Sequence, residues 1–321
     1  MDVISIKGEG ATELKPFLIS WSLTDSDDGT KADRLTLNFS GSQLQEYIPK
    51  SGCEWSVTID GEHRGAFQVS SVTEHLHPVK LVVQLTPAKF SVEDRSGFKE
   101  PRRRSFPPAT VSDVVKAVME PHGYDVRVSP ELACLLTGHL NQNEETDSAF
   151  ITRLATMYDA IAKPIDRMYV FGKRGSLKTL AGNVQRSIII SAQDVQKGSA
   201  KIAHPSNIRF KGIKAEWQTT ETGESGTAKI GHKPYYLIQD SVFKSADEAT
   251  QRAEAKLSEF NRRVQRFSAT LRGKPGLFAE SAMKLEGFCS LHSKGNWSIK
   301  SVTLSGTRST YTIQVEATRP A

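Results

Sequence analysis

Two segments near opposite ends of the chain share one pattern of alternating apolar and polar residues. The first, from Arg34 to Gly41, reads RLTLNFSG, and the second, from Arg266 to Gly273, reads RFSATLRG. Apolar side chains at every second position are typical of a β-strand with one face in a core. Both segments end in glycine, which indicates a turn. We therefore expect a strand at each place, in similar surroundings.

Two further strands follow each of these segments in the same order. In the next strand, three apolar residues are separated by steps of two and then three positions: Phe67, Val69 and Val72 in the first half, and Trp297, Ile299 and Val302 in the second. The extra residue in the second step is typical of a β-bulge, which keeps the third side chain on the buried face. The last strands begin at Leu81 and Tyr311. We predict two copies of one antiparallel β unit, although any two antiparallel domains share simple alternation.

The region between these units changes to a helical period. Thr110 precedes an apolar stripe over 111–119 and resembles a helix N-cap, and a second helix is expected from Asp147. Residues 93–205 are therefore predicted to form an inserted α+β domain between β domains at 1–92 and 206–321.

A third helix is predicted over 245–262. Ser245 and Glu248 have the spacing of a capping box, and alanines with Leu257 and Phe260 form one face. We expect this helix to cover one side of the C-terminal sheet. Two polar stretches, 97–108 and 219–233, are predicted to be exposed loops.

Composition excludes some classes of protein and leaves others open. Of 321 residues, 38% are hydrophobic and 24% charged, and no apolar run approaches the length of a membrane span. The first residues, MDVISIKGEG, lack the features of a secretory signal, so synthesis in a cytoplasm is expected. Cys53, Cys134 and Cys289 are far apart and odd in number, which argues against a disulfide framework.

Patterns that carry chemistry are weak. His75 and His77 would share one face of a strand, with His63 on a neighbouring strand, but no Cys, Asp or Glu completes a metal-ligand set. No serine elbow or phosphate-binding loop occurs, and the adjacent acids at 27–28 and 144–145 are typical of surface loops. We predict no catalytic, cofactor-binding or metal-binding residues, and no enzymatic activity.

The triplet Arg102, Arg103 and Arg104 is the strongest cluster of charge. With a net charge of +6 it could hold backbone phosphates, but no aromatic platform or recognition helix accompanies it. We interpret the triplet as a solvated linker or a contact for a partner protein, and expect no sequence-specific binding of nucleic acid.

The order of several segments resembles the late control gene D protein family, the tail hubs of contractile-tailed bacteriophages. These segments are SWSLTDSDDGTKADRLTLNF from Ser20, GAFQVSSV from Gly65, ETDSAFITRLATMYDAIAKP from Glu145, SADEATQRAEAKL from Ser245 and the closing paired strands. The family is similar to the hub part of the type VI secretion VgrG spike proteins. The resemblance covers essentially the whole chain.

The resemblance implies a mainly β fold with an α+β insert: two tail-tube-like antiparallel β-barrel or sandwich domains related by duplication. It implies a homotrimeric ring in the virion baseplate that adapts a sixfold tail tube above to a threefold central spike below. Other baseplate proteins and the tape-measure protein are further expected partners, and the insert is expected to contact spike or baseplate proteins. Two alternatives remain: a nucleic-acid-binding module that uses Arg102–Arg104, and a tail-associated cell-wall hydrolase.

Overall fold

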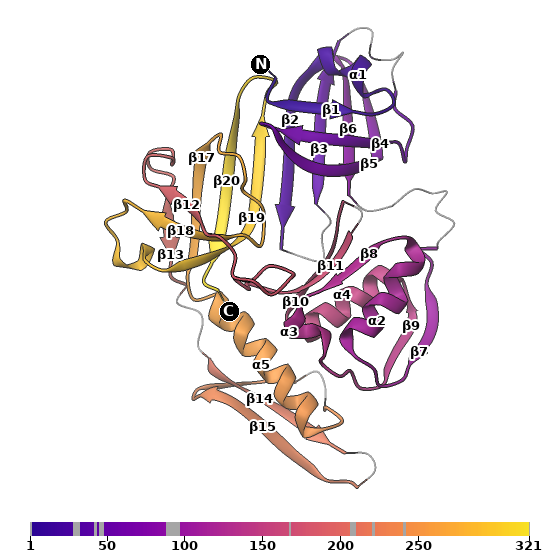
Figure 1. The fold of residues 1–321 in the computed structure, drawn as a ribbon, viewed down its shortest axis with the longest axis vertical. Coiled ribbons are helices and arrows are strands. Elements are labelled where there is room, and N and C mark those ends of the chain that lie inside the picture. Colours follow the sequence, from indigo (N-terminus) through magenta and orange to yellow (C-terminus); the bar gives the residue numbers. More distant parts are fainter. Residues whose placement is uncertain are drawn as a thin grey trace.

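One 12-stranded sheet forms the body of the molecule and is built from two sets of strands (Figure 1). The computed structural model describes residues 2–27, 33–41, 44, 48–87, 97–166, 168–205, 210–219, 222–239 and 242–320. The first β unit consists of β1 (Ile4–Lys7), β2 (Leu18–Ser26), β3 (Arg34–Ser40), β4 (Glu54–Ile59), β5 (Glu62–Leu76) and β6 (Val79–Thr86), with the short helix α1 (Ala11–Leu14). The second β unit consists of β12 (Ile188–Ser191), β13 (Lys201–Ala203), β17 (Arg266–Arg272), β18 (Ala282–Glu286), β19 (Asn296–Gly306) and β20 (Tyr311–Thr318).

The strands of the two units follow the same order across the sheet. When the six strands of each unit are numbered in chain order, they lie across the sheet in the order first, fourth, fifth, sixth, third and second. The register also corresponds in two rows of paired residues: Leu35, Leu85 and Val69 in the first unit, and Phe267, Ala317 and Ile299 in the second. One pairing differs, because β1 and β4 are antiparallel whereas β12 and β18 are parallel.

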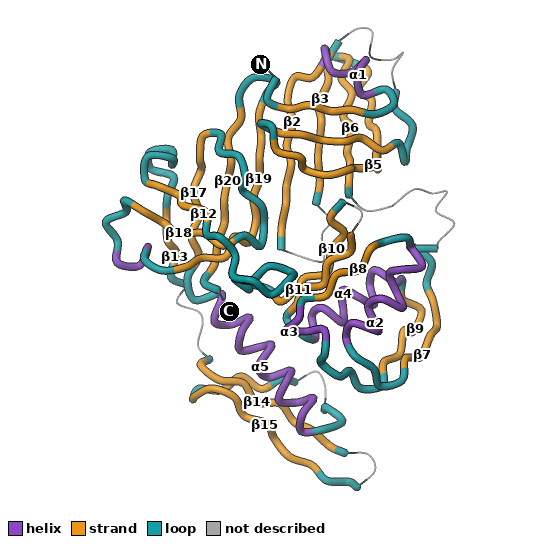
Figure 2. The backbone as a smooth tube through the Cα atoms, in the orientation of Figure 1, coloured by secondary structure: helices purple, strands orange, loops and turns teal. Residues whose placement is uncertain are grey.

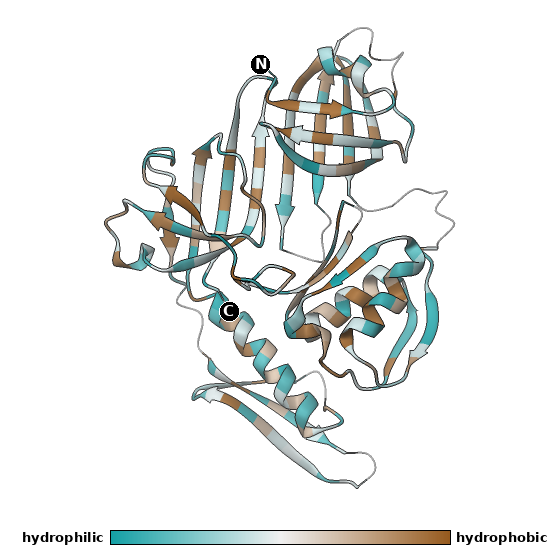
Figure 3. Cartoon of the chain, viewed as in Figure 1, coloured by the Kyte–Doolittle hydropathy of each residue, from teal (hydrophilic) through white to brown (hydrophobic). Residues whose placement is uncertain are grey.

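The predicted strands and both predicted bulges are confirmed. RLTLNFSG contains β3 and RFSATLRG contains β17, and buried residues alternate with more exposed ones along each. The register shifts after Val69 in β5 and after Ile299 in β19. As a result Val302 is fully buried, and Val72 is half-buried against the same core. Bands of hydrophobic residues along these strands mark the shared core (Figure 3).

The insert after the first unit is a separate α+β body. It contains β7 (Arg102–Phe106), α2 (Val111–Met119), β8 (Asp125–Val128), α3 (Pro130–Ala133), β9 (Leu140–Glu145), α4 (Asp147–Met157), β10 (Ala160–Ile165) and β11 (Met168–Lys173). Both predicted helices are confirmed, and the hydroxyls of Thr110 and Thr146 cap them by accepting from the backbone N–H groups of Asp113 and Ala149. This insert has its own core, which shares no residue with that of the large sheet.

A second small body, the hairpin unit, lies between β13 and β17. It contains β14 (Lys211–Gln218), β15 (Ser225–His232), β16 (Tyr235–Leu237) and α5 (Ala246–Arg262). The hydroxyl of Ser245 caps α5 as expected. Contrary to expectation, α5 packs against β14 and β15 and not on the C-terminal sheet, because Ala249 and Ala253 lie in a core with Ile213 and Ala215.

Strands of the second unit therefore lie on both sides of the boundary expected at 205/206, since β12 and β13 precede it and β17–β20 follow the hairpin unit. The domain boundaries at 92 and 205 stay a prediction. Figure 2 shows that the longer helices belong to the insert and the hairpin unit.

The two segments predicted to be loops contain strands. Residues 102–106 pair with β9, and residues 225–232 pair with β14 along their whole length. In β15 the side that faces α5 carries Gly226, Ala228 and Ile230. These side chains are small or isolated among polar residues, so the alternation of a strand is hard to recognise from the sequence.

The separate core of the hairpin unit gives a testable consequence. The substitution Ile213→Ala removes a fully buried side chain and should destabilise the unit by about 2–5 kcal/mol. Hydrogen exchange should then accelerate in 211–262 while β17, β19 and β20 stay protected. Ala269→Gly, in β17, serves as the control with the opposite distribution. Equal loss of protection in β17–β20 for Ile213→Ala would show that α5 and the C-terminal sheet share one cooperative core.

Candidate functional site

The seam between the two β units is a backbone pairing of β2 with β19. Residues 21–26 of β2 run antiparallel to residues 301–306 of β19, with Thr24 opposite Thr303. The indole N–H of Trp21 donates to the carbonyl of Thr307 at 2.8 Å, and the ring of Trp21 packs near that of Tyr311. Along the chain, the first unit is connected to the second through the insert. The pairing at the seam makes the two units one continuous sheet.

Each unit also presents an edge that corresponds to one side of the seam and has no strand partner among the described residues. In the first unit it is the side of β5, over residues 71–76, that faces away from β6. The equivalent side of β19 in the second unit pairs with β2 at the seam. In the second unit the edge is β13, which stands in the position of β2. The side chain of Leu76 is 75% exposed. The chain thus presents an edge equivalent to each side of the seam, one in each β unit.

A buried group of charges lies where the two β units meet the insert. Lys163, in β10, is almost fully buried, and its ammonium donates to the Oδ1 atom of Asp25 at 2.8 Å and to the carbonyl of Ser26 at 2.9 Å. Carboxylate oxygens of Glu280 and Asp33 lie 3.0 and 3.5 Å from the same ammonium. Asp25 also accepts from the backbone N–H of Ala279 at 2.8 Å. One cation from the insert therefore joins β2, the start of β3 and the loop before β18.

Glu280 and Asp33 hold their protons more tightly than usual. Burial raises the pKa of Glu280 to about 8 and that of Asp33 to about 7, although Lys163 opposes both shifts. Burial alone would lower the pKa of Lys163, but Asp25, Glu280 and Asp33 raise it above its ordinary value. Because three acids surround one ammonium, full ionisation would leave an excess of negative charge in the junction.

Two further ion pairs tie the insert to its neighbours. Arg262 of α5 forms a two-pronged pair with Asp159, and both side chains are buried. Arg174 lies 3.7 Å from the carboxylate of Asp27, whose pKa burial raises. Since the insert and the sheet have separate apolar cores, charged and polar contacts supply much of their attachment.

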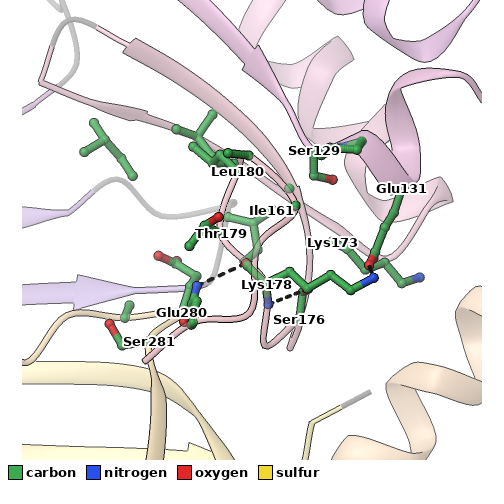
Figure 4. Close-up of a pocket in the computed structure, with 18 of the residues that line it drawn as sticks. Ser129, Glu131, Ile161, Lys173, Ser176, Lys178, Thr179, Leu180, Glu280 and Ser281 are labelled. Carbon is green, nitrogen blue, oxygen red and sulfur yellow. Dashed lines mark hydrogen bonds and ion pairs between the residues drawn. The ribbon is translucent and has the colours of Figure 1, made fainter. Parts of the chain in front are cut away.

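The junction borders a cavity of 430 Å³ between the insert sheet, the loop at 176–185 and the loop at 279–281 (Figure 4). Ile161 and Leu180 form part of its wall, and Glu280 and Ser281 approach from the second β unit. At the rim, Lys178 donates to Glu131 at 2.5 Å. We find no arrangement of nucleophile, base and oxyanion donor in this lining that would indicate catalysis.

The arginine triplet is divided by its strand. Arg102 and Arg104 point to one side, where Arg104 forms a close ion pair with Asp147, and Arg102 lies 3.6 Å from the same carboxylate. Arg103 points to the other side, with 77% of its side chain exposed and its guanidinium 2.6 Å from Glu144. Asp147 is fully buried and also accepts from Gln142 at 2.8 Å. Two of the three arginines thus neutralise an internal acid, and a partner contact of the triplet stays a prediction.

The histidines lie differently from the sequence expectation. His63 and His75 belong to the same strand, β5, twelve positions apart, and His77 lies in the following turn. Twelve positions of extended chain correspond to about 40 Å. Within the described ranges, no group of three or more His, Cys, Asp or Glu side chains could hold a metal ion. None of the helices that the structure describes is long and apolar enough to cross a membrane.

Lys163 was missed in the sequence, although it left a signal. It interrupts the apolar run AIAKPI, in which four neighbouring residues are buried. A lone cation in a buried strand implies an acidic partner, because an unpaired buried charge is strongly unfavourable. The identity of that partner could not be read from the pattern, since Asp25 and Glu280 are far away along the chain.

Comparisons with known proteins agree on the class of relative. A probable baseplate hub protein of Escherichia phage P2 is 23% identical over 93% of this chain and 87% of its own length, and that of Escherichia phage 186 is 22% identical over the same shares. This chain is similar to phage baseplate hub proteins. No family model matches it.

Solved structures show the same fold. The 43 kDa tail protein of prophage MuSo2 from Shewanella oneidensis superposes with a TM-score of 0.71 at 16% identity, covering 99% of this chain and 98% of that one. A tail protein from Neisseria meningitidis gives a TM-score of 0.69 at 13% identity, covering 98% and 96%. An Escherichia coli component of the type VI secretion system gives 0.58 at 12% identity, covering 99% and 77%. The predicted mainly β fold of the tail-protein type is confirmed.

The proton affinity of the junction makes stability depend on pH. Asp33 and Glu280 have folded-state pKa values of about 7 and about 8, above their ordinary values of 3.8 and 4.5. The folded chain therefore holds protons that the unfolded chain releases, so stability is greatest at acid pH and is lost as pH rises toward 8. The slope can reach about 1.4 kcal/mol per pH unit for each such proton. Denaturant unfolding between pH 5 and 9 should show this fall, and Glu280→Gln should flatten it. A pH slope in the Glu280→Gln variant as steep as that of the unchanged chain would contradict the assignment.

Removing the central cation tests the junction directly. Lys163→Met should destabilise the chain by about 3–5 kcal/mol, because it removes the cation from a buried group of three acidic side chains. Lys178→Met is the matched control: it breaks an exposed pair with Glu131 and should cost less than about 1 kcal/mol. Urea unfolding at pH 7 measures both, and equal effects of the two substitutions would reject the central role of Lys163.

Proposed function

We propose that this chain is the structural hub of a contractile phage tail or a related injection particle. In this proposal three copies form a ring that adapts the sixfold tail tube to the threefold central spike at the baseplate. The similarity to baseplate hub proteins along nearly the whole chain supports the class of function. No catalytic activity is part of the proposal.

The observation that carries the ring is the repeated strand order with its one internal seam. Two units with the same order of strands support an origin by duplication, and three chains would then supply six similar units. Within one chain, the β2 edge of the first unit pairs with β19 of the second. The corresponding edges that remain, β13 and the outer side of β5, would pair between chains in the same way. A head-to-tail contact of this kind closes into a ring when its rotation allows.

The correspondence of the units also predicts a register between chains. Val72 corresponds to Val302 by their pairing with Val83 and Val315, and Leu23 corresponds to Ile202 by their pairing with Leu35 and Phe267. By the same correspondence, Thr73 is equivalent to Thr303 and Ala203 is equivalent to Thr24. Because Thr303 lies opposite Thr24 at the seam, Thr73 of one chain would lie opposite Ala203 of the next.

A cysteine pair tests both the ring and its register. In a background with Cys134→Ser and Cys289→Ser, which removes the two exposed thiols, Thr73→Cys with Ala203→Cys should form disulfides between chains, because directly opposed residues of antiparallel strands can reach bonding distance. Non-reducing gels should show dimers and closed trimers, and light scattering should give a trimer mass. The control Glu74→Cys with Ala203→Cys places the thiols on opposite faces and should remain uncoupled.

A chain that stays monomeric at high concentration, both alone and with tube and spike proteins, would count against the ring. If both cysteine pairs formed disulfides equally well, the predicted register would be wrong. The ring itself would still be tested by the mass measured in light scattering.

A further inference from the structure

A basic cleft lies where α5, the insert and the lower end of the second β unit converge. Its volume is 450 Å³, and it is half-open to solvent. Six cationic and three acidic side chains line it, an excess of three positive charges: Arg174, Lys256, Arg262, Arg263, Arg266 and Lys300, with Asp27, Asp159 and Glu259. Nothing in the sequence pattern drew attention to it, because the residues come from distant parts of the chain.

Internal pairs account for some of these cations. Arg262 is bound by Asp159, Arg174 lies near Asp27, and Glu259 is shared by Lys256 and Arg263. The basic residues of the last turn of α5 also complement the negative end of the helix dipole. These contacts give a structural reason for four of the six cations.

Neither an ion pair of this kind nor the helix dipole accounts for Arg266 and Lys300. Arg266 opens β17 on the exposed face of the sheet, and Lys300 occupies the bulge of β19 beside the start of the seam. Neither side chain forms a direct ion pair among the described residues, although Lys300 is close enough to Asp27 for its charge to oppose the rise that burial causes in the pKa of that carboxyl. The cleft as a whole keeps an excess of positive charge in a concave site, which focuses the field toward an anion.

The composition of the cleft selects the class of anion. No aromatic side chain lines it, so unstacked bases would find no platform there. A cavity of this size admits single side chains and not a duplex. Guanidinium groups bind carboxylates with two parallel hydrogen bonds, and lysine adds a point charge.

We propose that this basic cleft binds an acidic segment of a partner protein, with Arg266 and Lys300 contacting its Asp or Glu carboxylates. This proposal does not rest on the ring proposed above, because it uses residues of a single chain. The elements that supply the lining, α5, the insert and the starts of β17 and β19, lie at the end of the sheet from which both inserted bodies emerge (Figure 1).

A labelled hexaglutamate peptide provides a defined probe for the full chain. Fluorescence anisotropy at about 50 mM salt should detect binding that weakens as salt increases. Arg266→Gln with Lys300→Gln should weaken it at least tenfold, and Arg266→Lys with Lys300→Arg should restore most of it. The control Lys211→Gln with Lys229→Gln removes the same charge from exposed positions of the hairpin unit and should change affinity less than twofold.

Thermal unfolding of each variant confirms that it is folded before binding is compared. If the two pairs of glutamine substitutions weakened peptide binding equally, the binding would depend on net charge alone, and the proposed site would be wrong. Absence of peptide binding at low salt would do the same. A single-stranded oligothymidylate that binds more tightly than the peptide, and loses this affinity only with Arg266→Gln and Lys300→Gln, would reassign the cleft to nucleic acid.

Discussion

The pairing of β2 with β19 is the interaction on which the rest of this architecture depends. Each β unit by itself would present an open edge, and an open edge invites pairing with another strand. The seam satisfies one edge of each unit inside the chain, and Trp21 anchors its upper end through the carbonyl of Thr307. Among the described residues, β13 and the outer side of β5 are the equivalents of the two strands of the seam and have no strand partner there. The ring proposed above would pair these two edges, so the internal contact would serve as the template for the contact between chains.

The attachment of the insert follows a different physical principle. Its apolar core is separate from that of the large sheet, so hydrophobic packing does not join the two bodies into one core. Polar interfaces between domains ordinarily allow relative motion. Here Lys163 reaches into a pocket of three carboxylates, and Arg174 and Asp159 add pairs at the side. Buried charges need well-defined geometry to be tolerated, so this junction favours one orientation of the insert over many loosely packed ones.

The sequence predicted the repeated core well because that core depends on local alternation. The strands around Leu37 and Ala269, both bulges and the capped helices at Thr110 and Ser245 follow from spacing alone. The hairpin unit was harder, because β15 replaces the usual large apolar residues with Gly226 and Ala228. The strand at Arg102–Phe106 was concealed by charge, since two arginines face an acid that lies more than forty positions away. Long-range pairs of this kind are set by tertiary structure and leave only isolated anomalies in the pattern.

The placement of the two inserted bodies gives the sheet a direction. In the first unit, β6 ends at Thr86, beside the start of β3 at Arg34. In the second unit, β13 ends at Ala203, beside the start of β17 at Arg266. These four residues therefore mark one end of the sheet. The insert follows the end of β6, and the hairpin unit connects the end of β13 to β17. Among the described residues, the opposite end carries the turn between Gly306 and Tyr311 and the short helix α1. A repeated unit with both inserted bodies at one end can present a repeated surface on one side and a specialised one on the other. The ring proposed above, between a sixfold and a threefold partner, would use such an asymmetry.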